Sequence, residues 1–144
     1  AHNNLSMAIA NTLAAIEAGA DSVDGCLRGL GAGSGNAQLE VLIGVLQRMG
    51  IETGVDFYQI MDAAEQVVEP LMHRPQVINN DGLMLGSAGV YSSFLLHARR
   101  AAKRFDVDIR DVLIELGKRR TVGGQEDMII DVAIEMAKET GRLQ

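Results

Sequence analysis

The feature that most constrains this fold is a single strand candidate in a chain that otherwise reads as helices. Residues 21–27 predict a short buried strand between amphipathic helices expected at 5–19 and 37–49. Helix, strand and helix of this length are typical of an α/β unit with parallel strands. A lone strand cannot pair its own edge groups. We therefore expect residues 1 to about 55 to need strand partners from outside this chain or from a neighbouring chain.

Beyond Gly54 the pattern predicts helices only. Asp56 and Gln59 have the spacing of a capping box, and they introduce a helix over 57–71 that Pro70 should kink or end. After a connector recognised by its composition, further helices are expected at 83–105, 108–116 and 125–139. The sequence therefore predicts a mostly α chain in two parts, a piece of an α/β barrel or layered sheet followed by a small helical module.

Charge and composition narrow the function classes. The net charge of −6 argues against nucleic acid, which is normally met by clustered positive charge. The single cysteine, Cys26, cannot form an internal disulfide, so it reads as a small buried hydrophobe in a chain that is not secreted. No apolar run reaches the roughly 18 residues of a membrane span. We expect a cytoplasmic protein without a membrane segment.

Two residues near the N-terminal end are candidates for a metal site. His2 is either a metal-ligating imidazole or an exposed histidine before a helix that Asn3 or Asn4 caps. Asn36 is either the N-cap of the helix over 37–49 or an amide whose oxygen faces a metal ion or a substrate. Asn36 ends a glycine-rich loop whose backbone could approach a small anion, although the loop lacks Rossmann spacing.

Tyr91 is the third candidate. It lies in a run of small residues that predicts close backbone packing early in the helix over 83–105. Its phenol could reach a site as a proton donor or could orient a substrate oxygen, or its ring could simply belong to the core. The basic run 118–120, followed by Gly123 and Gly124, could bind an anion or complement a helix C-terminus.

Taken together, several segments resemble the 4-hydroxy-2-oxovalerate aldolase family, the pyruvate aldolases of bacterial meta-cleavage pathways. The match runs in order along essentially the whole chain, and its last two segments are specific to this aldolase. The segments are His2-Asn3-Asn4-Leu5, Val23-Asp24, Gly29 through Ala37, Leu39-Glu40, Ala88 through Phe94, and Val122 through Ile129.

This resemblance implies a fold and a set of roles. The fold would be the C-terminal end of a TIM (β/α)8 barrel over 1–72, followed by a helical communication domain over 76–144. His2 would be the second histidine of a His-x-His pair that binds Mn²⁺, with Mg²⁺ or Co²⁺ as substitutes. Tyr91 would enter the active site beside the 4-hydroxyl of the substrate. The remaining metal ligands and the catalytic base would lie outside these residues.

The implied reaction is the cleavage of 4-hydroxy-2-oxopentanoate to pyruvate and acetaldehyde. The implied partner is an acylating acetaldehyde dehydrogenase that receives the aldehyde through a channel, and we expect an oligomer. We also expect this chain to represent the C-terminal portion of the enzyme and to be inactive alone. Two alternatives remain: a docking module without chemistry, and another metal-dependent lyase or synthase related to hydroxymethylglutaryl-CoA lyase and isopropylmalate synthase.

Overall fold

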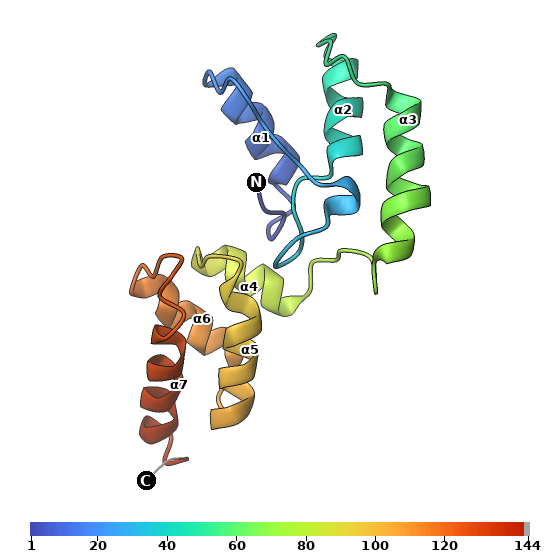
Figure 1. The fold of residues 1–144 in the computed structure, drawn as a ribbon. Helices are drawn as coiled ribbons and strands as arrows, with labels where there is room; N and C mark the ends of the chain where they lie inside the picture. The colour runs from blue at the N-terminus through green and yellow to red at the C-terminus, as the bar shows by residue number, and fades with distance from the viewer. Residues whose placement is uncertain (143–144) are drawn as a thin grey trace. The chain divides into compact units, whose positions relative to one another are not determined.

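The computed structural model describes residues 1–142 and divides into two compact units, Ala1–Ile78 and Asn79–Gln144. The first unit contains α1 (Ala8–Glu17), a single 3-10 turn η1 (Leu27–Gly29) and α2 (Leu39–Arg48). A second helical stretch follows as α3 (Phe57–Asp62), the π-helical η2 (Ala63–Val68) and the 3-10 turn η3 (Glu69–Leu71) (Figure 1). This stretch ends directly after Pro70, as predicted, because proline cannot donate to a continuing helix.

The predicted strand over 21–27 is wrong, because no strand occurs within residues 1–142. Instead, extended Cys26 forms one isolated parallel bridge with Gln38, and the chain turns at once into η1, where Arg28 has a φ of 56°. A strand needs a ladder of hydrogen bonds on at least one edge. Among the described residues, only this bridge and one between His2 and Asn36 offer such pairing.

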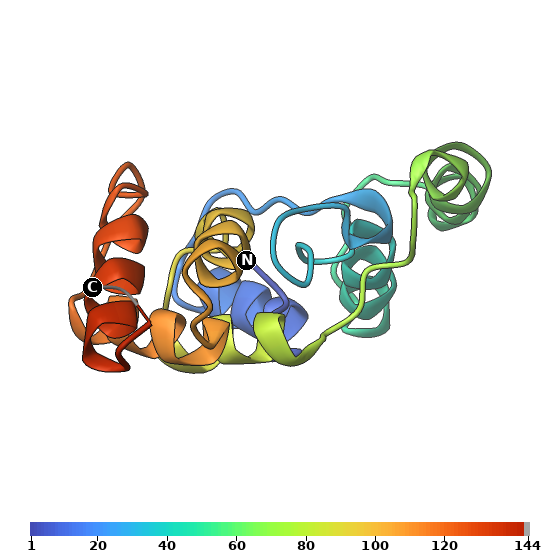
Figure 2. The same ribbon diagram turned by 90° about the horizontal axis from the view of Figure 1, so that it is seen from below.

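The second unit is a helical module with its own core. It contains α4 (Asn80–Ala88), α5 (Phe94–Phe105), α6 (Ile109–Lys118) and α7 (Met128–Glu139). Helix α4 packs against α6, and α5 packs against α7 (Figures 1 and 2). The apolar faces of these helices meet in one cluster of buried side chains that includes Leu85, Phe94, Leu113, Ile129 and Val132.

The single helix predicted over 83–105 is wrong. Gly89 ends α4 in the left-handed conformation (φ 69°), and the N–H of Val90 donates to the carbonyl of Leu85 at 3.1 Å. This arrangement is the usual helix stop, since only glycine enters it without steric cost. Helix α5 begins five residues later, so Tyr91 lies in the turn between two helices.

Other helix ends differ from the predictions by a few residues. Helix α1 begins at Ala8 and not at residue 5, because Ser6 has a left-handed φ of 60°. Helix α7 begins at Met128, after a turn that occupies the predicted first residues. Within residues 1–142, no helix is long and apolar enough to cross a membrane.

Candidate functional site

The structure brings two of the predicted site residues together. His2 and Asn36 face each other in an isolated antiparallel bridge, and the backbone hydrogen bonds on either side of the pair measure 2.8 and 2.9 Å. In this pairing the opposed residues have Cα atoms about 4.5 Å apart and side chains on the same face. His2 is exposed and Asn36 is half-buried. The imidazole and the amide therefore share one side of the glycine-rich loop.

The side chain of Asn36 belongs to this loop and does not cap a helix. Gln38 is the N-cap of α2, and no side chain caps that helix, so the predicted capping role is wrong. Instead, the Nδ2 of Asn36 donates to the Sγ of Cys26 and to the carbonyl of Leu30, each at 3.1 Å. A Cβ on Gly31 would lie 2.5 Å from that Nδ2. Residue 31 must therefore lack a side chain for the amide to take this position.

Two further polar residues hold the glycine-rich loop, and neither role was predicted from the sequence. Asn4 is buried, and its Oδ1 accepts the N–H of Ser34 at 2.9 Å. The Nε2 of Gln76 donates to the carbonyl of Gly31 at 3.3 Å. In the sequence, only the position of Asn4 close to His2 pointed to a role at the site, and nothing in the sequence pointed to Gln76. The Oγ of Ser34 is the one buried side-chain N or O atom of residues 1–142 that lacks a hydrogen-bond partner.

The donors near His2 fit only part of a site for a divalent ion. A neutral imidazole and an amide oxygen are suitable ligands for Mn²⁺ and similar metals. Within the described part of the chain, no three His, Cys, Asp or Glu side chains lie close enough to hold an ion. His2, with Asn36 beside it, can therefore supply one side of a metal site, and further ligands would have to complete it.

The third predicted residue, Tyr91, lies in the second unit. Its ring meets Phe94 edge-on, with centroids 6.5 Å apart and an interplanar angle of 89°. Phe94 is fully buried, whereas 54% of Tyr91 remains exposed. Tyr91 is therefore anchored at one edge to the core of the second unit while much of its side chain stays accessible.

The segment that begins at Val122 belongs to the loop between α6 and α7, which comes near Tyr91. Thr121 closes the end of α6, since its Oγ1 donates to the carbonyl of Leu116 at 3.2 Å. The N–H of Val122 donates to the Oε1 of Gln125 at 3.0 Å, so the glutamine side chain ties the loop into a turn. Gly123 lies close to Tyr91, because a Cβ added at Gly123 would lie 3.3 Å from the Cε1 of that ring. Two segments separated in the sequence thus approach one aromatic ring.

The basic run at the end of α6 is ion-paired. Arg119 contacts Glu115 at 3.0 Å and Glu135 at 2.5 Å, and Lys118 lies 3.4 Å from Glu115. The hydrogen bonds that Arg119 donates, first to Glu135 and then to Glu115, raise the pKa of Arg119, and the bond that it donates to Glu115 lowers the pKa of Glu115. Because carboxylates are paired with two of the three basic side chains, those of Lys118 and Arg119, this arrangement favours a structural role over an anion site.

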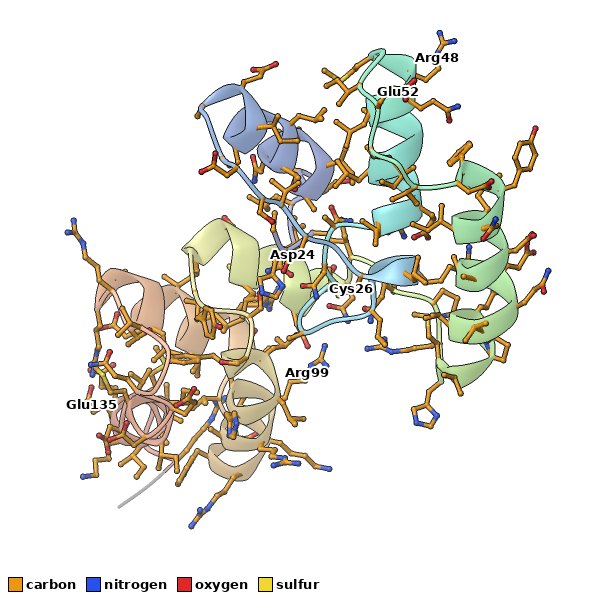
Figure 3. All side chains as sticks on the ribbon, turned by 45° about the horizontal axis from the view of Figure 1, so that its top comes forward. Asp24, Cys26, Arg48, Glu52, Arg99 and Glu135 are labelled. Carbon is orange, nitrogen blue, oxygen red and sulfur yellow. The ribbon has the colours of Figure 1, made fainter. Side chains whose placement is uncertain are left out.

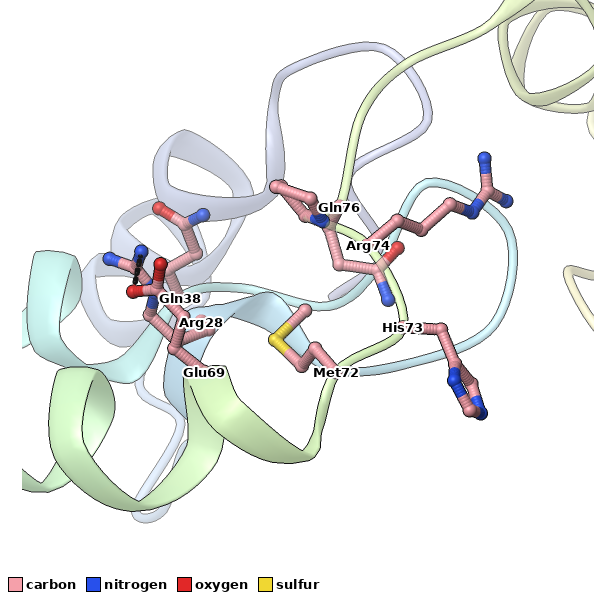
Figure 4. A pocket seen from close by; sticks show the side chains of 8 residues that line it. Arg28, Gln38, Glu69, Met72, His73, Arg74 and Gln76 are labelled. Carbon is pink, nitrogen blue, oxygen red and sulfur yellow. Dashed lines mark hydrogen bonds and ion pairs between the residues drawn. The ribbon is translucent and has the colours of Figure 1, made fainter.

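A cavity of about 350 Å³ in the first unit lies where η1 approaches the end of η3. Arg28 and Glu69 form an ion pair on one side of it, while the side chains of His73 and Arg74 point away from that pair (Figure 4). None of the three predicted site residues lines this cavity. Its polar groups diverge, so it offers no convergent set for binding or catalysis.

Comparison with known proteins matches each part of the chain to one family. Residues 1–67 match the HMGL-like family model, and residues 76–138 match the DmpG-like communication domain. Together the two matches leave only a short connector and the C-terminal residues uncovered.

The most similar relatives include proteins named 4-hydroxy-2-oxovalerate aldolase from three bacteria. The protein of Moorella thermoacetica is 67% identical over 98% of this chain, and that of Carboxydothermus hydrogenoformans is 67% identical over 96%. The protein of Geobacillus thermodenitrificans is 64% identical over 96%. The chain spans 40% to 42% of the length of these relatives. Along nearly its whole length, the chain is therefore similar to a part of proteins named 4-hydroxy-2-oxovalerate aldolase.

Proposed function

We propose that this chain forms the C-terminal portion of a divalent-metal-dependent aldolase that cleaves 4-hydroxy-2-oxopentanoate to pyruvate and acetaldehyde. The observation that supports this most is the 67% identity to a protein named 4-hydroxy-2-oxovalerate aldolase over 98% of the chain. Residues 1–72 would complete the end of a TIM barrel, in which the segment 21–27 gains the strand neighbours that it lacks here. Residues 76–144 would form the communication domain.

The cleavage requires a base for the 4-hydroxyl proton and a group that stabilises the enolate. A base removes the proton of the 4-hydroxyl, the C3–C4 bond breaks, and its electron pair becomes the enolate of pyruvate, which is then protonated at C3. Mn²⁺, or Mg²⁺ or Co²⁺ in its place, would supply Lewis-acid stabilisation of that enolate. His2 would hold the ion, and Asn36 would present its amide oxygen on the same side of the glycine-rich loop. No residue of this chain is assigned as the base.

Tyr91 would act at the other end of the substrate. Its exposed phenol can donate a hydrogen bond, and its anchored ring limits the positions that the hydroxyl can take. We infer that this hydroxyl orients the 4-hydroxyl side of the substrate during cleavage. Orientation of this kind raises the rate because the reacting groups no longer lose entropy in the transition state.

The helical domain would dock an acylating acetaldehyde dehydrogenase that receives the aldehyde, and the full enzyme would be an oligomer. Apolar side chains left exposed on the second unit support a docking role, since such patches favour protein contacts. They are Leu83, Leu96, Ile114, Val122 and Ile130.

A chimera tests the proposal. The chain replaces the matching stretch of the Moorella thermoacetica protein, and pyruvate release is measured with Mn²⁺. We expect activity in the chimera, a loss of at least about 10²-fold in His2→Ala, and a loss of about 10²-fold in kcat in Tyr91→Phe. His73→Ala and Tyr58→Phe replace an exposed histidine and the other tyrosine, so they serve as matched controls and should retain activity.

The chain alone gives the second arm of the test. We expect no pyruvate release from it with Mn²⁺, because His2 has too few partners to hold an ion. Measurable turnover would overturn this expectation. An inactive chimera that still binds the dehydrogenase would replace the aldolase proposal with a docking module.

A further inference from the structure

The turn that carries Tyr91 is fixed at both ends. Gly89 closes α4 before it, and the N–H of Phe94 donates to the carbonyl of Tyr91 at 3.0 Å as α5 begins. Phe94 is buried, so the chain cannot rotate at this point without disturbing the core of the second unit. The backbone of Tyr91 is therefore set, and the remaining freedom lies in its ring.

Gly123 lies beside the ring of Tyr91, where a side chain would restrict the positions that the ring can take. A Cβ built on Gly123 would lie 3.3 Å from the Cε1, 3.5 Å from the Cδ1 and 3.9 Å from the Cζ of Tyr91. The first of these distances is tighter than ordinary van der Waals contact. A side chain at residue 123 would therefore crowd the ring of Tyr91, and the ring of Phe94 meets that ring edge-on from another direction.

The two adjacent positions 123 and 124 of this loop require glycine for different physical reasons. Gly124 has a φ of 93° and no atom within 4 Å of its potential Cβ, so the backbone conformation requires glycine there. Gly123 is not among the residues with a positive φ, yet a side chain on it would press on the ring. Backbone conformation therefore gives no reason for glycine at 123, whereas the position of Tyr91 does.

Hydrogen bonds also hold the loop around Gly123 in one conformation. The side chain of Gln125 accepts the N–H of Val122, and the N–H of Gln125 donates to the carbonyl of Val122 at 3.2 Å. Thr121 ties the preceding residue to the end of α6. Hydrogen bonds of the residues on both sides of Gly123 thus fix the backbone position of Gly123 in the loop.

We propose that Gly123 is a positioning residue for Tyr91: by lacking a side chain, it sets the depth at which the ring lies and hence where the phenol hydroxyl points. This inference rests on the proposed function, in which that hydroxyl orients the substrate. A methyl group at 123 would push the ring by a few tenths of an ångström, which orientation-dependent catalysis registers as a loss of about tenfold.

The packing is tested by NMR on the full 144-residue chain in a Tyr58→Phe background, where Tyr91 is the only tyrosine. We expect cross-relaxation between the ring protons of Tyr91 and the Hα protons of Gly123. Gly123→Ala should shift the ring signals, whereas Val122→Ala, which shortens the exposed neighbouring side chain and keeps glycine at 123, should leave them nearly unchanged. Absence of the contact, or unchanged ring signals in Gly123→Ala, would overturn the proposal.

The functional part is tested by kinetics in the aldolase chimera. Gly123→Ala should lower kcat about tenfold with little change in KM, and it should cost nothing further in a Tyr91→Phe background. A structural role for Gly123 would instead give losses that multiply in the double variant, and this result would contradict the inference. If Tyr91→Phe itself retained full kcat, the proposed role of Tyr91 in orienting the substrate would be wrong. The role of Gly123 in catalysis would then be wrong as well, even if the NMR contact were present.

Discussion

At the scale of single residues, short polar side chains determine where helices begin. Asp56, Asn79 and Asp108 are the N-caps of α3, α4 and α6, and each accepts a backbone N–H at 2.9 to 3.0 Å. These bonds satisfy donors that a helix leaves free at its first turn. The capping bond of Asp56 confirms a prediction that needed only the local spacing of Asp56 and Gln59.

Asp108 should make the stability of the second unit depend on acid pH. Side-chain and backbone hydrogen bonds from Arg110 lower the pKa of Asp108 from 3.8 to about 2. The folded state therefore gains stability that is complete above pH 3.8 and is lost as the pH falls through about 2. Because 36% of this side chain is exposed, solvent screening limits the effect to ~1 kcal/mol.

Urea unfolding between pH 5 and pH 2 measures this effect. Asp108→Asn keeps a capping oxygen but cannot titrate, so its unfolding midpoint should depend less on pH across that window than the midpoint of the unchanged chain. Identical pH profiles for the two proteins would exclude Asp108 as the source.

At the scale of elements, one helix crossing depends on the absence of a side chain. A Cβ on Gly117 of α6 would lie 2.2 Å from the carbonyl oxygen of Ala88, the last residue of α4. The backbones of these helices therefore touch next to the turn that carries Tyr91. A second crossing anchor is the ion pair in which the Nε of Arg99 on α5 donates to Asp81 on α4 at 2.7 Å; Arg99 is labelled in Figure 3.

Gly117→Ala should destabilise the second unit, although helix propensity alone would favour alanine by about 1 kcal/mol. The new methyl group would meet backbone, which cannot move aside, and we expect a loss of roughly 2 kcal/mol. Gly44→Ala in α2 is the matched control, since its Cβ would meet only the ring of Phe57, at 3.0 Å. Thermal unfolding measures both, and a stabilised Gly117→Ala variant would show that α4 and α6 are not in close backbone contact.

At the scale of the whole molecule, the two units differ in how much core they contain. The buried hydrophobic cluster lies entirely in the second unit and draws on all four of its helices. In the first unit the largest buried side chains come from α2, and large apolar residues such as Met7, Met49 and Leu71 are exposed. The second unit therefore has a core of its own, whereas the first unit has a small core and exposes large apolar side chains of the kind that favour protein contacts.

Hydrogen exchange should reveal this difference. In the isolated chain we expect the slowest amides in α5, α6 and α7, and faster exchange in α1 and α2, because little apolar surface is released when they open. In the aldolase chimera, the amides of α1 and α2 should become protected. Equal protection of both units in the isolated chain would show that the first unit needs no further partner.

The sequence by itself determined most of the helices, the cap at Asp56 and the resemblance to 4-hydroxy-2-oxovalerate aldolases. Hydrophobic periodicity, Asp108 and Pro70 act over a few residues, so their consequences can be read locally. The predicted strand and the uninterrupted helix over 83–105 were wrong for a related reason. A strand exists only with a partner, and the stop at Gly89 depends on a φ that the residue permits but does not enforce.

Only the tertiary structure decided which site residues meet. It opposed His2 to Asn36 across a bridge, bound the Asn36 amide to Cys26, and set Tyr91 on Gly123. Each contact joins residues at least ten positions apart, and no periodicity or cap encodes such a pair. Local sequence fixes backbone preferences, whereas the position of a side chain depends on whatever the fold places beside it.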